Sequence, residues 1–377
     1  MSEPTQAAPP LLASNLLAAA KVHESSRPAP ASSGSAVIDE EALSGGFIYG
    51  EITSIAGANG PCKTLLAYHA TASHLLKDSL GEVAFIDTTG SFSPLRLRDV
   101  LVFRLEAKAQ REGYEHSGYM YERASSKAEE TKQGFINEAT ALLDRVKVMR
   151  VFDLAGVIEA VAEVGEMRET VTQASVKPAS IARRAKDEVS DSEKELEEED
   201  EFAFGPAAVQ GEQVAEPQGG QVGIIVIDTI TNVVSSLMSK GQTQGQALLT
   251  SFMRTLYHLT SRHHICTILT NAAVALTSSN NPEYKRRPED NVSIFSSTMG
   301  KPALGKTFTY LIDTSVFLSE IPKTMNDAAT AFDERMDGAP FRKAFVLEVL
   351  KDRCGMREGR WVAFDILDEF KVVPCRS

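Results

Sequence analysis

Residues 57–64 read Gly57-Ala58-Asn59-Gly60-Pro61-Cys62-Lys63-Thr64, and this stretch decides the fold class. It matches the phosphate-loop pattern G-x-x-x-x-G-K-[ST], except that cysteine replaces the glycine directly before the lysine. In such a loop backbone N–H groups surround the phosphates, the lysine reaches the β/γ oxygens, and the Ser/Thr hydroxyl holds Mg²⁺. We therefore expect residues 57–64 to bind a nucleotide, with Thr64 as a Mg²⁺ ligand. A Cβ where glycine is usual is expected to cost about 1–2 kcal/mol and so to weaken binding.

The sequence on either side of the loop has the order that the motif requires. Residues 51–56 alternate as a strand does, and residues 63–77 place apolar side chains at helical spacing. Further along the chain, residues 222–227 form a continuous apolar run that ends at Asp228, as in a buried parallel strand. We expect Asp228 to hold Mg²⁺ together with Thr64. The alternative is that Asp228 caps the helix that follows.

Composition and charge limit the size of the domain, its cellular setting and its partners. The chain has 377 residues, of which 43% are hydrophobic, enough for a large α/β domain with insertions. Its net charge is −12, but residues 166–216 alone hold 14 acidic and 6 basic residues, so the rest is closer to neutral. The four cysteines show no paired metal spacing, which indicates a reducing, intracellular setting. The apolar residues 11–20 are too few to cross a bilayer, so no membrane contact is expected.

Shifts in composition divide the chain into four parts. Residues 1–44, rich in Ala, Pro and Ser, are expected to form a disordered tail, and residues 45–167 the first part of the core. Residues 168–220 are expected to be an acidic, disordered insertion, either a regulatory or partner-binding segment or a solvated spacer. Residues 221–377 would complete the core and add C-terminal strands. The alternation of strands and helices predicts an α/β fold with a mostly parallel central sheet and a β-rich C-terminal part.

Several segments together resemble the RecA/Rad recombinase superfamily, and within it the eukaryotic recombinase paralogues. They are residues 50–57, 85–92, 228–231, 270–271 and 300–306, and the match covers roughly residues 45–320. The phosphate-loop region looks like the short X-ray-repair cross-complementing paralogue, whereas residues 301–306 look more like the delta paralogue. The resemblance implies a RecA-like phosphate-loop NTPase core that binds ATP and Mg²⁺.

Three departures from the active recombinase pattern concern ATP. Thr89 occupies the position of the glutamate that polarises the attacking water in active members, and a threonine is no general base near neutral pH. Ala272 occupies the position of a glutamine that senses the γ-phosphate, and alanine has no group for that task. With Cys62 in the loop, these changes predict weak or no ATP hydrolysis, unless another acid substitutes for Thr89.

The resemblance also places a DNA-binding loop at residues 272–299. Here Lys285, Arg286 and Arg287 are adjacent, and such charges can contact the phosphates of single-stranded DNA irrespective of sequence. The alternative is a solvated surface loop with a chance basic triplet.

The resemblance implies an assembly or mediator factor in homologous recombination and double-strand break repair. Its partners would be other recombinase paralogues and the recombinase filament, and its location the nucleus. An alternative is an active DNA-dependent ATPase that remodels recombinase filaments on single-stranded DNA. A nucleotide or small-molecule kinase is a third hypothesis, but such enzymes usually carry convergent arginines in a lid, and Arg286-Arg287 is the only nearby pair.

Overall fold

A computed structural model describes most of the chain between residues 27 and 375. The described ranges are 27–116 without Asn59 and Pro61, 125–175, 220–275, 293–295, 298, 300–332 and 342–375, with a few positions between 12 and 21. Among these residues, none of the helices has the length and apolar character needed to cross a membrane.

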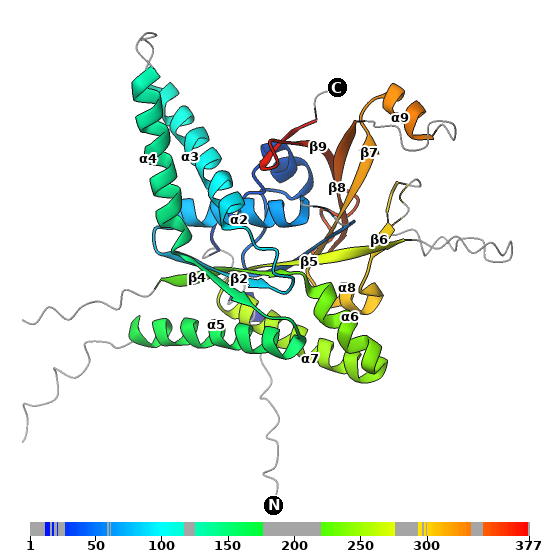
Figure 1. The fold of residues 1–377 in the computed structure, drawn as a ribbon. Coiled ribbons are helices and arrows are strands. Elements are labelled where there is room, and N and C mark those ends of the chain that lie inside the picture. Colours follow the sequence, from blue (N-terminus) through cyan, green and yellow to red (C-terminus); the bar gives the residue numbers. More distant parts are fainter. Residues whose placement is uncertain are drawn as a thin grey trace, which may run out of the picture.

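One large twisted sheet organises the fold (Figure 1). Its strand order is β10-β9-β8-β7-β1-β5-β4-β2-β3, and the short strand β6 pairs with β5. The strands are β1 Ile52–Gly57, β2 Gly81–Asp87, β3 Val146–Arg150, β4 Gln221–Asp228, β5 Cys266–Ala275, β6 Gly300–Pro302, β7 Thr314–Pro322, β8 Lys343–Asp352, β9 Trp361–Leu367 and β10 Lys371–Pro374. All pairings from β7 through β1 to β3 are parallel, while β8, β9 and β10 add on in antiparallel fashion. The predicted α/β class, with a mostly parallel sheet and a β-rich C-terminal part, is confirmed.

Helices cover both faces of the sheet (Figure 1). The helices of the described residues are the π-helix η1 Ile38–Ala42, α2 Cys62–Lys77, α3 Pro94–His116, α4 Ser125–Leu143, α5 Leu154–Ser175, α6 Ile230–Lys240, α7 Gln242–Arg262, α8 Gly305–Tyr310 and α9 Met325–Phe332. One hydrophobic cluster joins α2, α3 and α4 to the first face, and a second joins α5, α6, α7 and α8 to the opposite face. Burial on both faces explains why the central strands read as apolar runs rather than as alternating patterns.

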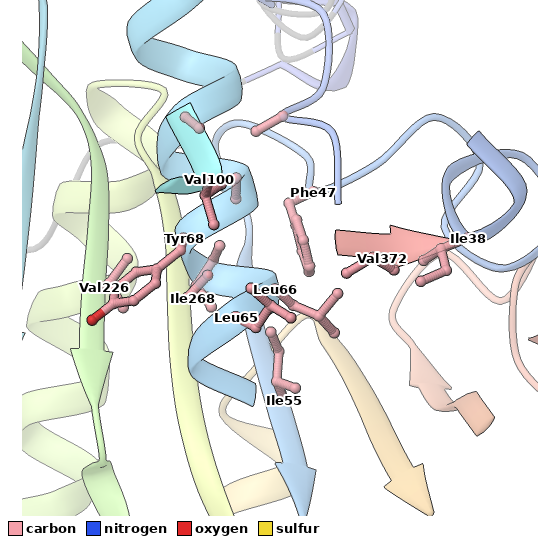
Figure 2. Packing of buried hydrophobic residues seen from close by; sticks show 14 of the residues in the cluster. Ile38, Phe47, Ile55, Leu65, Leu66, Tyr68, Val100, Val226, Ile268 and Val372 are labelled. Atoms are coloured by element: carbon pink, nitrogen blue, oxygen red, sulfur yellow. The ribbon is translucent and has the colours of Figure 1, made fainter. Parts of the chain in front are cut away.

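The first cluster packs α2 directly onto the phosphate-loop strand. Figure 2 shows Leu65 and Leu66 of α2 beside Ile55 of β1. Val372 of β10 and Phe47, which precedes β1 in the chain, lie next to them. All five side chains are buried. The start of α2, and with it the phosphate loop, is therefore fixed by packing on the sheet.

The ordered fold begins earlier than expected, so the boundary at residue 44 needs correction. Ala31 and Phe47 exchange two backbone hydrogen bonds of 2.8 Å, and Ile38 and Leu43 are buried in the first cluster. The serines of this segment are also engaged, because Asp39 accepts hydrogen bonds from Ser32 Oγ (2.6 Å) and Ser33 N (2.8 Å). A composition rich in Ala, Pro and Ser concealed the few apolar residues that anchor the segment.

Helices α3 and α4 pack side by side (Figure 1). Helix α5 extends to Ser175, so the expected insertion at 168–220 begins with helical residues. Residues 176–219, which include its acidic block, lie outside the described residues.

Candidate functional site

The phosphate-loop residues lie between β1 and α2, at the carboxyl end of the parallel strands. Lys63 Nζ folds back over the loop and donates hydrogen bonds to Gly57 O (3.2 Å) and Ala58 O (2.5 Å). Burial lowers the pKa of Lys63, and the negative charge of Asp228 opposes that shift. Gly60 is described within the loop, whereas Asn59 and Pro61 lie outside the described residues. The lysine is thus a buried cation whose acceptors are loop carbonyls.

The two glycines of the loop have different surroundings. A Cβ at Gly57 would lie 2.9 Å from Leu318 Cβ and 3.0 Å from Leu318 O on the neighbouring strand β7. At Gly60 no atom would lie within 4 Å of an added Cβ. Gly57 is therefore required by the packing of β7, while Gly60 faces open space.

Cys62 does not strain the backbone. It is the first residue of α2 and has a helical conformation, so a glycine is not needed there for its dihedral angles. Burial raises the pKa of its thiol to about 12, with Lys63 opposing the rise, so the side chain is a neutral thiol. Backbone strain therefore does not contribute to the free-energy cost expected for a Cβ at position 62. The remaining contribution would be crowding of a bound phosphate by the side chain.

Thr64, at the start of α2, and Asp228, at the end of β4, are in contact, although 164 residues separate them in the sequence. Thr64 Oγ1 donates to Asp228 Oδ2 at 2.7 Å, and Thr270 Oγ1 donates to Asp228 Oδ1 at 2.5 Å. The N-cap of α6 is Thr229 rather than Asp228, so the alternative of a helix cap at Asp228 is wrong. A hydroxyl and a carboxylate at this separation are the oxygen ligands that Mg²⁺ prefers.

Asp87, the register partner of Asp228 on β2, organises the turn that contains Thr89. Its carboxylate accepts backbone N–H groups from residues 89, 90, 91 and 92 at 2.8–3.2 Å. Burial acts to raise the pKa of Asp87, but these hydrogen bonds outweigh it and leave the pKa below its usual value. Thr89 Oγ1 lies 2.7 Å from Ser91 Oγ, so its hydroxyl belongs to the same turn.

Ala272 lies within β5, directly after Thr270 and Asn271. Its backbone N–H donates to Thr231 Oγ1 (2.7 Å), which in turn donates to Asn271 Oδ1 (2.7 Å). The methyl side chain of Ala272 offers no polar atom, so its own contact with α6 is made through its backbone N–H.

A cavity of about 540 Å³ opens beside the phosphate loop. Ala58, Gly60, Cys62 and Lys63 line one side, and side chains from β7 and β8 line the other, namely Phe317, Leu318, Ser319, Glu320, Ile321, Lys343 and Phe345. Glu320 and Lys343 form an ion pair of 2.8 Å at this cavity. Its size falls within the range of small-molecule sites, and its mixture of aromatic and polar groups is typical of them.

The structure also shows contributors that the motif could not indicate. Thr270, Glu320, Lys343 and Phe345 reach the site through the order of the strands, which no local pattern of the sequence encodes. Lys285, Arg286 and Arg287 lie outside the described residues, so the predicted DNA-binding triplet stays a prediction.

The residues described near the carboxyl-terminal end of the predicted DNA loop, 293–295 and 298, lie next to the cavity. Glu348 on β8 accepts hydrogen bonds from Ser293 Oγ (2.6 Å) and Ile294 N (2.7 Å), and Phe295 and Thr298 line the cavity. Residues 293–295 and 298 therefore lie beside the phosphate loop.

The chain matches no model of a known protein family. Among solved structures it is similar to the crystal structure of the RadB recombinase, with a TM-score of 0.46 and 18% sequence identity. That similarity covers 92% of this chain and 100% of the RadB chain. At this level of likeness the fold class rests on the strand order and the strand–loop–helix geometry described above.

Proposed function

We propose that the protein binds ATP and Mg²⁺ at the phosphate loop, hydrolyses ATP weakly or not at all, and acts as an assembly factor in homologous recombination. The observation that carries the first part is the meeting of Lys63, Thr64 and Asp228 beside a cavity of about 540 Å³. In this proposal residues 57–64 surround the phosphates, and bound nucleotide stabilises the folded chain and an interface with a partner.

Each side chain of the site has a role that its present contacts favour. The ammonium group of Lys63 would exchange its carbonyl acceptors at Gly57 and Ala58 for phosphate oxygens, which are stronger partners because they are charged. Thr64 and Asp228 would hold Mg²⁺, which neutralises phosphate charge when bound. Thr270 would keep the Asp228 carboxylate in position through its 2.5 Å hydrogen bond.

Weak hydrolysis is supported by the state of the nearby carboxylates. Asp87 is committed to the backbone N–H groups of its turn, which lower its pKa and make it a poor base. Asp228 is committed to two hydroxyl groups and, in the proposal, to Mg²⁺. Glu320 belongs to β7, which lies on the other side of β1 from β4 and Asp228.

The role in recombination is supported by the sequence resemblance to the recombinase paralogues. On that basis we propose partners of the same kind, other paralogues and the recombinase filament, and a nuclear location. We also propose that Lys285, Arg286 and Arg287 contact single-stranded DNA. The position of Phe295 and Thr298 at the cavity supports a path between such a loop and the nucleotide.

The second candidate function, a DNA-dependent ATPase that remodels filaments, requires a substitute for the missing glutamate. Glu320 is the carboxylate of the cavity lining and so is the residue to test first. The two candidates differ in turnover, which can be measured with purified protein in the presence and absence of single-stranded DNA.

The test compares the wild type with Lys63→Ala and Glu320→Gln. We expect weak or no turnover in the wild type, and no stimulation of turnover by DNA in any of the three proteins. DNA-stimulated hydrolysis that Lys63→Ala abolishes would instead establish the ATPase, and its loss in Glu320→Gln would identify the acid. If repair in cells survived Lys63→Ala, the ATPase alternative would be excluded.

A further inference from the structure

A second cavity, of about 790 Å³, lies at the opposite end of α2 from the phosphate loop. It is lined by the N-terminal segment around residues 32–45, by α2 and by α3. Lys77, the last residue of α2, is one of its lining residues. A rise of 1.5 Å per residue places Lys77 about 20 Å along the helix from Lys63, so the two cavities are separate.

Basic side chains dominate this second cavity. The charged residues of its lining are Lys77, Arg104, Lys108 and Arg111, against Asp39 and Glu40. Positions 104, 108 and 111 of α3 share one face of the helix, because they are spaced by four and three residues. A basic cavity in a chain of net charge −12 is a local feature and does not follow from the overall composition.

The hydrogen bonds of two of these cations go to neutral oxygens. Arg104 Nη1 donates to Ser32 Oγ at 3.3 Å, and Lys77 Nζ donates to Pro30 O at 2.9 Å. Asp39, the buried acid of the lining, is engaged by Ser32 Oγ and Ser33 N. The positive charge of the cavity is therefore only partly balanced by the residues around it.

The positive charges of these side chains also repel one another. Burial lowers the pKa of Arg104, and the charge of Arg111 acts in the same direction while Asp39 opposes it. Burial likewise lowers the pKa of Lys77, and the charge of Arg104 adds to that effect. An anion in the cavity would relieve both the desolvation and the mutual repulsion.

We propose that this cavity binds a phosphate group, with Arg104, Arg111 and Lys77 as its ligands. Guanidinium groups match the oxygens of a phosphate in bidentate geometry, and a nearby ammonium adds a point charge. The volume of the cavity is within the range of small-ligand sites. The phosphate can belong to a small molecule or to a phosphorylated side chain, and two probes distinguish these sources.

The experiment is a calorimetric titration of the full-length Lys63→Ala protein, in which the phosphate loop is disabled. The probes are inorganic phosphate and a synthetic peptide of residues 186–201, with Ser190 and Ser192 either phosphorylated or not. Arg111→Gln and Arg104→Gln are added in this background. Arg98→Gln is the matched control, because Arg98 lies on the same helix but pairs with Asp99 at 2.9 Å.

We expect at least one phosphate-bearing probe to bind, and each cavity variant to weaken it by about tenfold or more, as for a lost charge-assisted hydrogen bond. Arg98→Gln should bind as the background protein does. Binding of inorganic phosphate alone would identify a small-molecule source; preference for the phosphorylated peptide would identify a protein source. The proposal is overturned if neither phosphate-bearing probe binds, or if Arg104→Gln and Arg111→Gln both bind as tightly as the control. Arg111 is exposed, so its variant separates lost binding from lost folding.

Discussion

Gly57 has a structural task that is separate from any ligand. The adjacent strand β7 approaches so closely that a Cβ at Gly57 would lie 2.9 Å from Leu318 Cβ. The first glycine of the phosphate-loop pattern is thus needed by the packing of the chain itself, whereas the same argument does not hold for Gly60.

Gly57→Ala is therefore expected to lower the free energy of unfolding by about 1–3 kcal/mol, the usual cost of overpacking. Urea denaturation without nucleotide measures it. Gly60→Ala, which meets no atom within 4 Å, is the control and should change stability by less than about 0.5 kcal/mol. Equal losses in the two variants would contradict the close-packing argument.

At Cys62 the sequence motif predicted some properties of the residue and not others. The motif identified the position as unusual, and the expected cost included backbone strain. The helical conformation of Cys62 and its buried, neutral thiol could not be read from the pattern, because they depend on how α2 packs.

At the scale of elements, Arg357 ties the C-terminal strands to the start of β1. It follows β8 and donates to Asp352 Oδ1 and Oδ2 (both 2.9 Å), to Thr314 Oγ1 (2.8 Å) and to Glu51 Oε2 (3.4 Å). Only 5% of Arg357 is exposed, so these charges are satisfied by one another rather than by water.

Arg357→Ala should destabilise the protein by about 3–5 kcal/mol, because it leaves the buried Asp352 carboxylate without its cation and leaves Glu51 with the longer ion pair to Arg27 (3.8 Å). Arg360→Ala removes an exposed arginine nearby that bonds Ser44 Oγ, and should cost less than about 1 kcal/mol. Thermal and urea unfolding of both variants test this, and an Arg357→Ala protein as stable as Arg360→Ala would refute it.

Helices and strands with a clear apolar pattern could be predicted from the sequence. Short elements, whose few residues show no distinct spacing, could not. The apolar run at 222–227 and the helix after the phosphate loop appear as expected in β4 and α2. Helix α8 ends at Tyr310, and β7 begins at Thr314. Helix α8 has six residues, too few for helical spacing to distinguish it from the strand that follows.

The order of the strands is the property of the whole molecule that builds the candidate site. It places Thr270 beside Asp228 and brings Lys343 and Phe345 to the phosphate loop. Local sequence patterns contain no information about which strands are neighbours, so these residues could not be predicted, whereas Lys63, Thr64 and Asp228 could be.

Two buried histidines couple the stability of the whole fold to pH. Burial lowers the pKa of His69 and of His74 from 6.5 to about 4, and the charge of Arg104 contributes at His69. Because the unfolded chain takes up these protons first, the stabilisation is present above pH 6.5 and is lost as the pH falls towards 4.

Between about pH 7 and pH 4.5 the wild type should lose about 2–3 kcal/mol more stability than His69→Gln, which has no titrating ring. The glutamine amide can still donate to Phe370 O, as His69 Nε2 does at 2.9 Å. Urea unfolding at the two pH values gives the comparison, with the exposed His258→Gln as control. A His69→Gln protein with the pH dependence of the wild type would show that this ring does not titrate as described.

The central claim is that Lys63, Thr64 and Asp228 form a working site for Mg-ATP, and calorimetric titration of ATP tests it most directly. We predict saturable binding by the wild type in Mg²⁺ and weaker binding when the metal is chelated. Lys63→Ala should weaken binding by about tenfold or more, as expected when a charge-assisted contact to phosphate is lost. Absence of binding by the wild type, or equal affinity of wild type and Lys63→Ala, would contradict the account.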